Sequence, residues 1–89
     1  METEKVQFEQ LVERGCGIDI HKKVAVATID GTGLKRTTRE FDTFTSSLTK
    51  LKDWLLENNI THVVMESTGV YWKPVYHVLE PSGIKIWIV

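Results

Sequence analysis

Cysteine is almost absent from this sequence, and the single Cys16 excludes an internal disulfide bond. A lone thiol is compatible with a reducing compartment, which favours a cytoplasmic location. One cysteine and three scattered histidines form no zinc-type spacing. Apolar runs of the roughly 18 residues needed to cross a bilayer are also absent, as is a signal-peptide pattern at the N-terminus. We therefore expect no membrane partner.

An excess of charge of either sign is missing as well. The 89 residues contain 11 Lys and Arg against 12 Asp and Glu, so the formal net charge is −1. The overall charge therefore gives no electrostatic footprint for nucleic acid. The length is sufficient for one small domain, and 42% hydrophobic residues are ordinary for a soluble globular protein.

The chain divides into a charged N-terminal arm and a domain that begins with strands. Residues 1–14 are charged and weakly amphipathic, which predicts a helical or disordered arm. Residues 15–20, 24–29 and 34–41 are predicted strands, and the glycine-rich stretch 30–33 indicates a turn. We expect these strands to form an antiparallel meander with the polar third strand at an edge.

Helical spacing of leucines predicts a helix after the meander. The helix is expected to begin with Thr43 or Thr45 as its cap and to end at Asn58 and Asn59, because Asn tolerates the left-handed conformation. The strand predicted next, 61–66, contains an unbroken apolar run. Such a run is typical of a central strand that is covered on both faces.

A second helix, over residues 70–80 and capped by Ser67 or Thr68, is predicted to lead to a last strand, 84–89. The order is then β-β-β-α-β-α-β, an α/β fold with a mixed five-stranded sheet whose last two strands follow helical crossovers and run parallel. The sequence ends on the apolar run 86–89, and we interpret the 89 residues as a fragment of a longer chain.

Two acidic residues are the candidates for chemistry. Asp19 lies within an apolar strand, and Glu66 ends the apolar run of another. If these strands are parallel neighbours, both carboxylates lie toward their carboxyl ends, where open α/β sheets place ligands. Mg²⁺ or Mn²⁺ suits such oxygen ligands and supports phosphodiester chemistry. Alternatively, the two are ordinary strand-end acids, solvated or in salt bridges with Lys22 or Lys23.

Two segments carry a family resemblance, residues 17–23 (GIDIHKK) and residues 65–72 (MESTGVYW). Together, and at this separation, they resemble the N-terminal RuvC-like domain of the DEDD transposases of the insertion sequence one-ten group, over roughly residues 15–89. The resemblance implies an RNase H-like (RuvC-like) fold, truncated before its last helices. It also implies that Asp19 and Glu66 are the first two of four catalytic, metal-binding acids.

The resemblance also implies what a full-length protein of this type does. In a prokaryotic cytoplasm it would cleave and join DNA strands with Mg²⁺ or Mn²⁺ during transposition, with a structured guide RNA. Separately, the apolar run 86–89 leads us to expect a homo-oligomer. The other two acids, in an Asp-x-x-Asp segment, and the downstream domain with a nucleophilic serine are absent from this sequence. We therefore expect the 89 residues alone to bind metal weakly and to lack nuclease activity.

Residues beside the two acids admit more than one interpretation. Lys22 is expected to contact a phosphate, to balance Asp19 or simply to be solvated. His21 is expected at a turn or on the surface rather than as a ligand. Ser67 and Thr68 are expected to cap the second helix rather than to act as nucleophiles, because no base is paired with them.

The aromatic residues and the cysteine are expected to serve packing. Tyr71 and Trp72 are expected to pack the second helix onto the sheet rather than to stack on a base. Trp54 is predicted in the core, and Trp87 is expected to face a missing part of the domain. Cys16 is interpreted as a small buried hydrophobe.

Two other functions stay open. A nucleotide-binding module of the actin-like or sugar-kinase type shares the strand order but places a Gly- and Thr-rich turn where this sequence has residues 21–23. A non-catalytic binding or oligomerisation module is the other alternative, because an apolar edge strand at 86–89 invites association.

Overall fold

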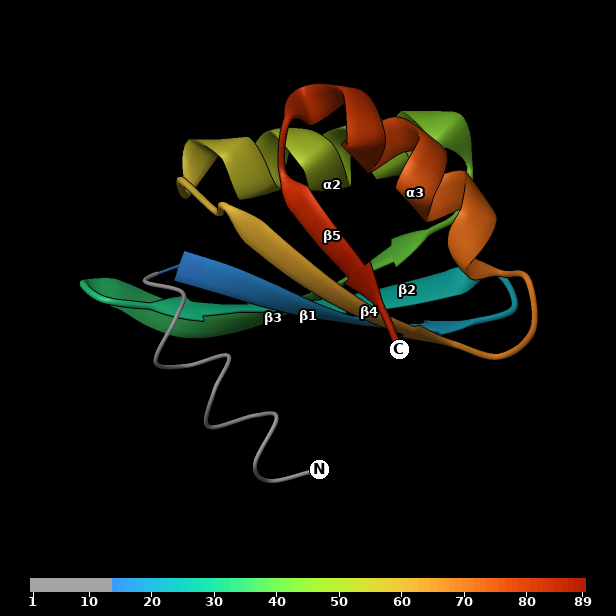
Figure 1. Cartoon of the computed structure of the whole chain (residues 1–89), viewed down its shortest axis with the longest axis horizontal. Coiled ribbons are helices and arrows are strands. Elements are labelled where there is room, and N and C mark those ends of the chain that lie inside the picture. Colours follow the sequence, from blue (N-terminus) through green and yellow to red (C-terminus); the bar gives the residue numbers. More distant parts are fainter. Residues whose placement is uncertain (1–13) are drawn as a thin grey trace.

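The computed structural model describes residues 14–89 and contains five strands, two α-helices and one short 3-10 helix (Figure 1). In chain order these are β1 (Arg14–His21), β2 (Val24–Gly31), β3 (Leu34–Asp42), α2 (Thr45–Glu57), β4 (His62–Ser67), α3 (Trp72–Leu79), η1 (Glu80–Ser82) and β5 (Lys85–Ile88). The predicted strands and helices are present, with ends shifted by up to two residues. The predicted arm lies outside the described residues except for Arg14, which belongs to β1 instead.

All five strands form one mixed sheet in the order β3-β2-β1-β4-β5. The pairs β1–β2 and β2–β3 are antiparallel, whereas β4 pairs in parallel with both β1 and β5. The predicted meander and the two parallel crossovers are therefore confirmed. The polar strand β3 lies at one edge, as expected, and β5 lies at the other.

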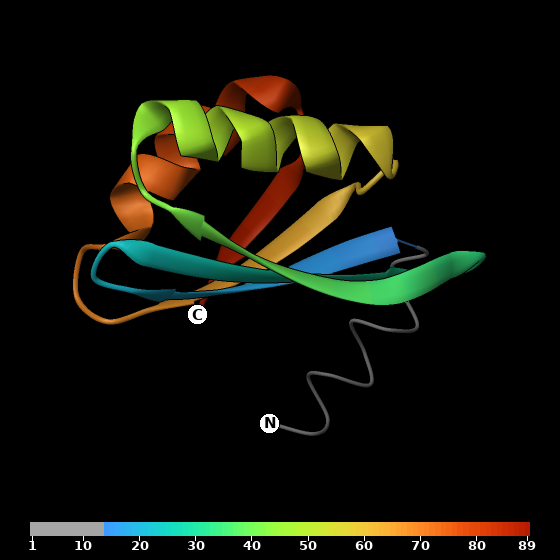
Figure 2. The same cartoon turned by 180° about the vertical axis from the view of Figure 1, so that it is seen from behind.

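Both helices cover the same face of the sheet, as Figures 1 and 2 show from opposite sides. The expectation that β4 is covered on both faces is therefore wrong for the described residues. Its apolar run is continuous, but only Val63 and Met65 are fully buried, while Val64 between them is half-buried. The reason is the two-residue period of a strand, which turns alternate side chains away from the helices.

The core lies between the sheet and the two helices. Leu48, Leu51 and Leu55 of α2 recur at helical spacing and are almost fully buried, so the predicted apolar face of this helix is confirmed. Strand β1 contributes the alternate residues Cys16 and Ile18. No buried side chain within residues 14–89 is polar or charged. Burial of apolar area is thus the main stabilising term of this face.

The helices begin differently from the prediction, and no side-chain hydrogen bond caps either of them. Phe44 is the N-cap of α2, and its N–H donates to Asp42 Oδ1 at 3.1 Å. That short turn takes the place of a cap by Thr43 or Thr45. Tyr71 is the N-cap of α3, so the expected caps Ser67 and Thr68 are wrong as well.

The predicted end of α2 is confirmed. Asn58 is its C-cap, and Asn59 follows with a φ of 57°, in the left-handed region that Asn tolerates. The Arg14 guanidinium donates from Nη1 to the Asn58 carbonyl at 2.9 Å, which ties the end of α2 to the start of β1. None of the helices in residues 14–89 is long and apolar enough to cross a membrane.

Candidate metal and phosphate site

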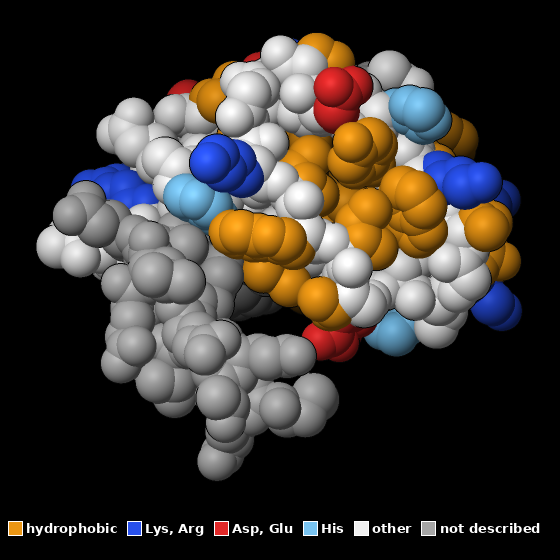
Figure 3. All heavy atoms as spheres, viewed as in Figure 1, with side chains coloured by type: hydrophobic (Ala, Val, Ile, Leu, Met, Phe, Trp, Pro, Cys, Tyr) orange, Lys and Arg blue, Asp and Glu red, His pale blue; other side chains and the backbone are white. Residues whose placement is uncertain are grey.

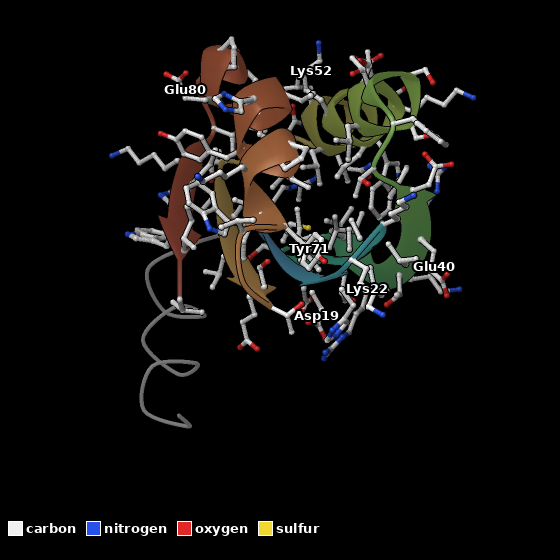
Figure 4. All side chains as sticks on the ribbon, turned by 90° about the vertical axis from the view of Figure 1, so that its right-hand side faces the viewer. Asp19, Lys22, Glu40, Lys52, Tyr71 and Glu80 are labelled. Atoms are coloured by element: carbon white, nitrogen blue, oxygen red, sulfur yellow. The ribbon has the colours of Figure 1, made fainter. Side chains whose placement is uncertain are left out.

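Asp19 and Glu66 are neighbours on the two parallel strands β1 and β4. They are register partners in that ladder, so their Cα atoms lie opposite each other. Ile18, Ile20 and Met65 beside them in the chain are buried under the helices, and strand alternation therefore turns both acids to the open face. Both residues are exposed, and Figure 4 shows Asp19 on the side of the sheet away from the helices.

The side chain in contact with the Asp19 carboxylate is a histidine rather than a lysine. His21 Nε2 lies 3.1 Å from Asp19 Oδ1, and the two side chains are 62% and 59% exposed. Within residues 14–89 no ion pair joins Asp19 or Glu66 to Lys22 or Lys23. The interpretation of the acids as salt-bridge partners of these lysines is therefore wrong.

Two like charges on adjacent strands repel each other. Paired strands lie about 4.8 Å apart, so the carboxylates rise from closely spaced backbone positions and share an exposed face. A cation between them would remove this repulsion. Because Asp19 Oδ1 is engaged by His21, Oδ2 of Asp19 and the carboxylate of Glu66 are the oxygens open to a ligand.

The donor set of this pair fits a hard divalent cation. Mg²⁺ prefers oxygen ligands, keeps several water molecules and is commonly bound by only one or two protein carboxylates. Residues 14–89 contain no group of three or more His, Cys, Asp or Glu side chains that could enclose an ion. The pair can therefore hold a cation only if water, phosphate or further acids supply the other ligands.

A glycine next to the acids leaves the open face of the sheet without a side chain at that position. Gly17 lies two positions before Asp19 on the same face, and a Cβ placed there would meet no atom within 4 Å. Packing within the described residues therefore does not require glycine at this position. A glycine inside a strand often marks a place where another backbone or a ligand approaches closely.

The other aromatic candidates mostly serve packing. Trp72 is half-buried against the core, with its ring 5.8 Å from that of Tyr76, so its predicted packing role is confirmed. Tyr71 is 41% exposed. Trp54 is half-buried rather than fully in the core, and its ring lies 5.8 Å from that of Phe41. Trp87 is exposed on β5 and stacks on His62, with ring centroids 5.2 Å apart.

Cys16 is the small buried hydrophobe that the sequence predicts. Its side chain is only 1% exposed within the core. Burial raises the pKa of this thiol from 9.0 to about 12, although a backbone hydrogen bond from Thr28 acts in the opposite direction. Because the thiolate is the reactive form, Cys16 is chemically inert in the folded protein.

Two further surface features lie away from the acids. A shallow hollow between Leu56, Ile60 and Ile84 lies at the amino ends of β4 and β5. Glu66 lies at the opposite end of β4. Hydrophobic side chains also gather over α3 and β5 in Figure 3, and the exposed ones near these elements are Val70, Tyr71, Trp87, Ile88 and Val89. The expected self-association is compatible with this surface and stays a prediction.

The contact between His21 and Asp19 is the feature of the site that the sequence interpretation missed. The available signal was their spacing, because residues two apart in a strand project from the same face. The expectation of a surface histidine is correct for its exposure. It overlooked the carboxylate within reach of the ring.

A family model described as Transposase matches residues 16–89, which places the protein in the transposase class. The matching model is that of the IS110-type DEDD transposases, and the chain belongs to this family. The family resemblance predicted from residues 17–23 and 65–72 is thereby confirmed. No curated protein matches the chain.

Two solved structures with a similar fold come from the Ppx/GppA proteins of Aquifex aeolicus. The crystal structure of the Aquifex aeolicus member of the Ppx/GppA family has a TM-score of 0.54 at 16% identity, covering 88% of this chain and 35% of that one. A second structure, of the Aquifex aeolicus PPX-GPPA enzyme, has a TM-score of 0.53 at 16% identity, covering 88% of this chain and 36% of that one. The chain thus spans about a third of the length of either structure. At this identity the likeness concerns the fold alone.

Proposed function

We propose that this chain forms part of an RNase H-like (RuvC-like) catalytic domain that cleaves and joins DNA strands in transposition. Asp19 and Glu66 supply its first two metal-binding carboxylates. The observation that carries the proposal is the register pairing of these acids on one open face of β1 and β4. Membership of a transposase family supports DNA as the substrate in this proposal.

The residues of the chain have separate tasks in this proposal. Asp19 and Glu66 would hold Mg²⁺ or Mn²⁺, and His21 contacts Oδ1 of Asp19 and so helps to orient this carboxylate. A bound divalent cation promotes ionisation of the attacking group and stabilises the charge that develops on phosphate. Gly17 leaves room beside Asp19 for the DNA strand.

Completion of the site requires groups from outside these residues. The sequence contains no Asp-x-x-Asp segment, and the described residues hold no third acid near the pair. We therefore propose that two further acids join the site in the protein that the whole reading frame encodes, and that a guide RNA selects the DNA on which it acts. The 89 residues alone are expected to bind metal weakly and to cleave no DNA.

Metal binding by the chain tests the role of the acids. We expect Mn²⁺ to broaden the amide NMR signals around Asp19 and Glu66, and we expect Asp19→Asn or Glu66→Gln to abolish this effect. Glu40→Gln is the matched control, because Glu40 is an exposed acid in the same cross-strand row, reached from Asp19 through Val26. Glu40 lies on the outer strand β3 and is labelled in Figure 4. Equal broadening in all variants would contradict the proposal.

Strand cleavage tests the same acids in the protein encoded by the whole reading frame. Asp19→Asn and Glu66→Gln are each expected to abolish cleavage, with an unchanged circular dichroism spectrum and unchanged thermal midpoint. Both residues are exposed, so neither substitution opens a cavity. Retained cleavage in either variant would remove Asp19 or Glu66 from the mechanism.

The nucleotide-binding alternative predicts a different ligand. Its glycine-rich phosphate turn would fall at the β1–β2 connection, where this chain has Lys22 and Lys23. We expect ATP with Mg²⁺ to leave the thermal midpoint of the chain unchanged. A rise in the midpoint would favour the alternative over DNA chemistry.

A further inference from the structure

The β1–β2 connection is a two-residue hairpin with Lys22 and Lys23 at its tip, between the register partners His21 and Val24. The tip lies at the carboxyl end of β1. The parallel strand β4 ends at the same end of the sheet, where Glu66 lies. Lys22 follows Asp19 by three positions, about 10 Å along an extended strand. Figure 4 looks onto this end of the sheet and shows Asp19 and Lys22 close together in the view.

Lys22 has an unfavourable backbone conformation for a residue with a side chain. Its φ is 52°, in the left-handed region where Cβ approaches the backbone too closely. Two-residue hairpins favour glycine or asparagine at such positions. The β2–β3 hairpin of the same sheet follows this preference, because Gly33 takes the positive φ of 72° there. The first hairpin therefore retains a lysine where glycine would be less strained.

Contacts within the described residues do not explain this lysine. Both tip lysines are exposed, and neither forms an ion pair in residues 14–89. The interpretation that Lys22 balances Asp19 is wrong for the described residues, because no ion pair joins these two side chains. Strained residues that bring no internal contact tend to occur at ligand-binding sites, where the strain is offset by binding.

We propose that Lys22, with Lys23 beside it, binds backbone phosphates of the DNA strand that passes over Asp19 and Glu66. This inference rests on the proposed function and adds the group that holds the strand next to the acids. Two carboxylates repel a phosphate backbone, and the paired ammonium groups at the same end of the sheet counteract that repulsion. Such contacts fix the position of a strand without reading its sequence.

Three substitutions separate the charge of Lys22 from its backbone strain. Lys22→Gln removes the charge and keeps the strain, Lys22→Arg keeps both, and Lys22→Gly removes both. Binding of the 89-residue chain to a short fluorescein-labelled DNA duplex is measured by anisotropy across a salt series in EDTA. We expect Lys22→Gln to weaken binding several-fold at low salt and to reduce the slope of log K against log salt by about 0.9. Lys22→Arg should bind like the unsubstituted chain.

The glycine variant gives a signature that a merely structural role does not produce. Lys22→Gly is expected to raise the midpoint of urea unfolding while weakening DNA binding. Asn59→Gly is the matched backbone control, because Asn59 has a φ of 57° at the end of α2. It should raise the midpoint and leave DNA binding unchanged. Lys35→Gln, at the other end of the sheet, is the charge control and should leave the salt slope unchanged.

Two results would overturn the inference. One is equal DNA affinity of Lys22→Gln and Lys35→Gln across the salt series, and the other is absence of salt-dependent DNA binding by the unsubstituted chain. Because EDTA removes divalent cations, these results do not depend on the metal site. A failure of the Mn²⁺ experiment with Asp19→Asn would instead contradict the proposed function and leave the lysine result to be judged separately.

Discussion

The two faces of the sheet are formed by alternate residues of the same strands, yet they differ in almost every respect. The face under α2 and α3 contributes apolar side chains to a core without any buried polar side chain among residues 14–89. The opposite face carries Gly17, Asp19, Thr28 and Glu66, which are exposed or half-exposed. Packing and the proposed metal binding thus belong to different residues, and substitutions on one face should leave the other intact.

The largest expected effect is on the packed face. Leu51 of α2 is fully buried, and Leu51→Ala should lower the free energy of unfolding by about 2–5 kcal/mol through lost apolar contacts and a residual cavity. Leu56→Ala is the control on the same helix, because Leu56 is 43% exposed, and its effect should stay within about 0.5 kcal/mol. Urea denaturation measures both, and equal losses would contradict the division into faces.

The next effect is also on the packed face and depends on pH, and it is smaller when compared for a single pH unit. The thiol of Cys16 has its pKa raised from 9.0 to about 12 in the folded protein, so the unfolded chain releases this proton first. The stabilising contribution is complete below pH 9 and falls by about 1.4 kcal/mol per pH unit between pH 9 and 12. Urea denaturation at several pH values should show this fall reduced in Cys16→Ala. Parallel curves for the two proteins would contradict the buried neutral thiol.

The smallest effect is expected on the open face. Thr28 and Thr38 share a hydrogen bond of 2.8 Å between their hydroxyl oxygens across β2 and β3. Cross-strand pairs of this kind contribute about 0.2–1 kcal/mol. A double-mutant cycle with both threonines changed to alanine should give a coupling energy in that range. A coupling energy larger than the loss in unfolding free energy caused by Leu51→Ala would reverse the comparison between the faces.

Most of the fold could be predicted from the sequence because local signals agree with the global arrangement. Leucine spacing located α2, and Asn59 marked its end with a conformation that few other residues adopt. The helix starts could not be predicted correctly, because Asp42, Thr43 and Thr45 all compete for the same free N–H groups. Only the position of the backbone decides that Asp42 accepts from Phe44.

The site was predictable as far as strand direction determines it. Parallel pairing of β1 with β4 follows from the crossover helix, and it places Asp19 opposite Glu66. The contact of His21 with Asp19 depends on side-chain rotamers, which a sequence pattern does not specify. The strain at Lys22 left only an indirect signal, a two-residue turn without Gly or Asn.

The long separation of β1 and β4 in the chain has a consequence for the order of folding events. The Thr61 hydroxyl, which precedes β4, donates to the Arg14 carbonyl across 47 residues. Closing so long a loop costs chain entropy before the parallel ladder forms, so we expect the local β1–β2–β3 hairpins and α2 to form earlier. An emerging polypeptide would therefore carry both acids long before they meet. The divalent-ion binding that we propose for these acids would then arise only with the final cooperative step of folding.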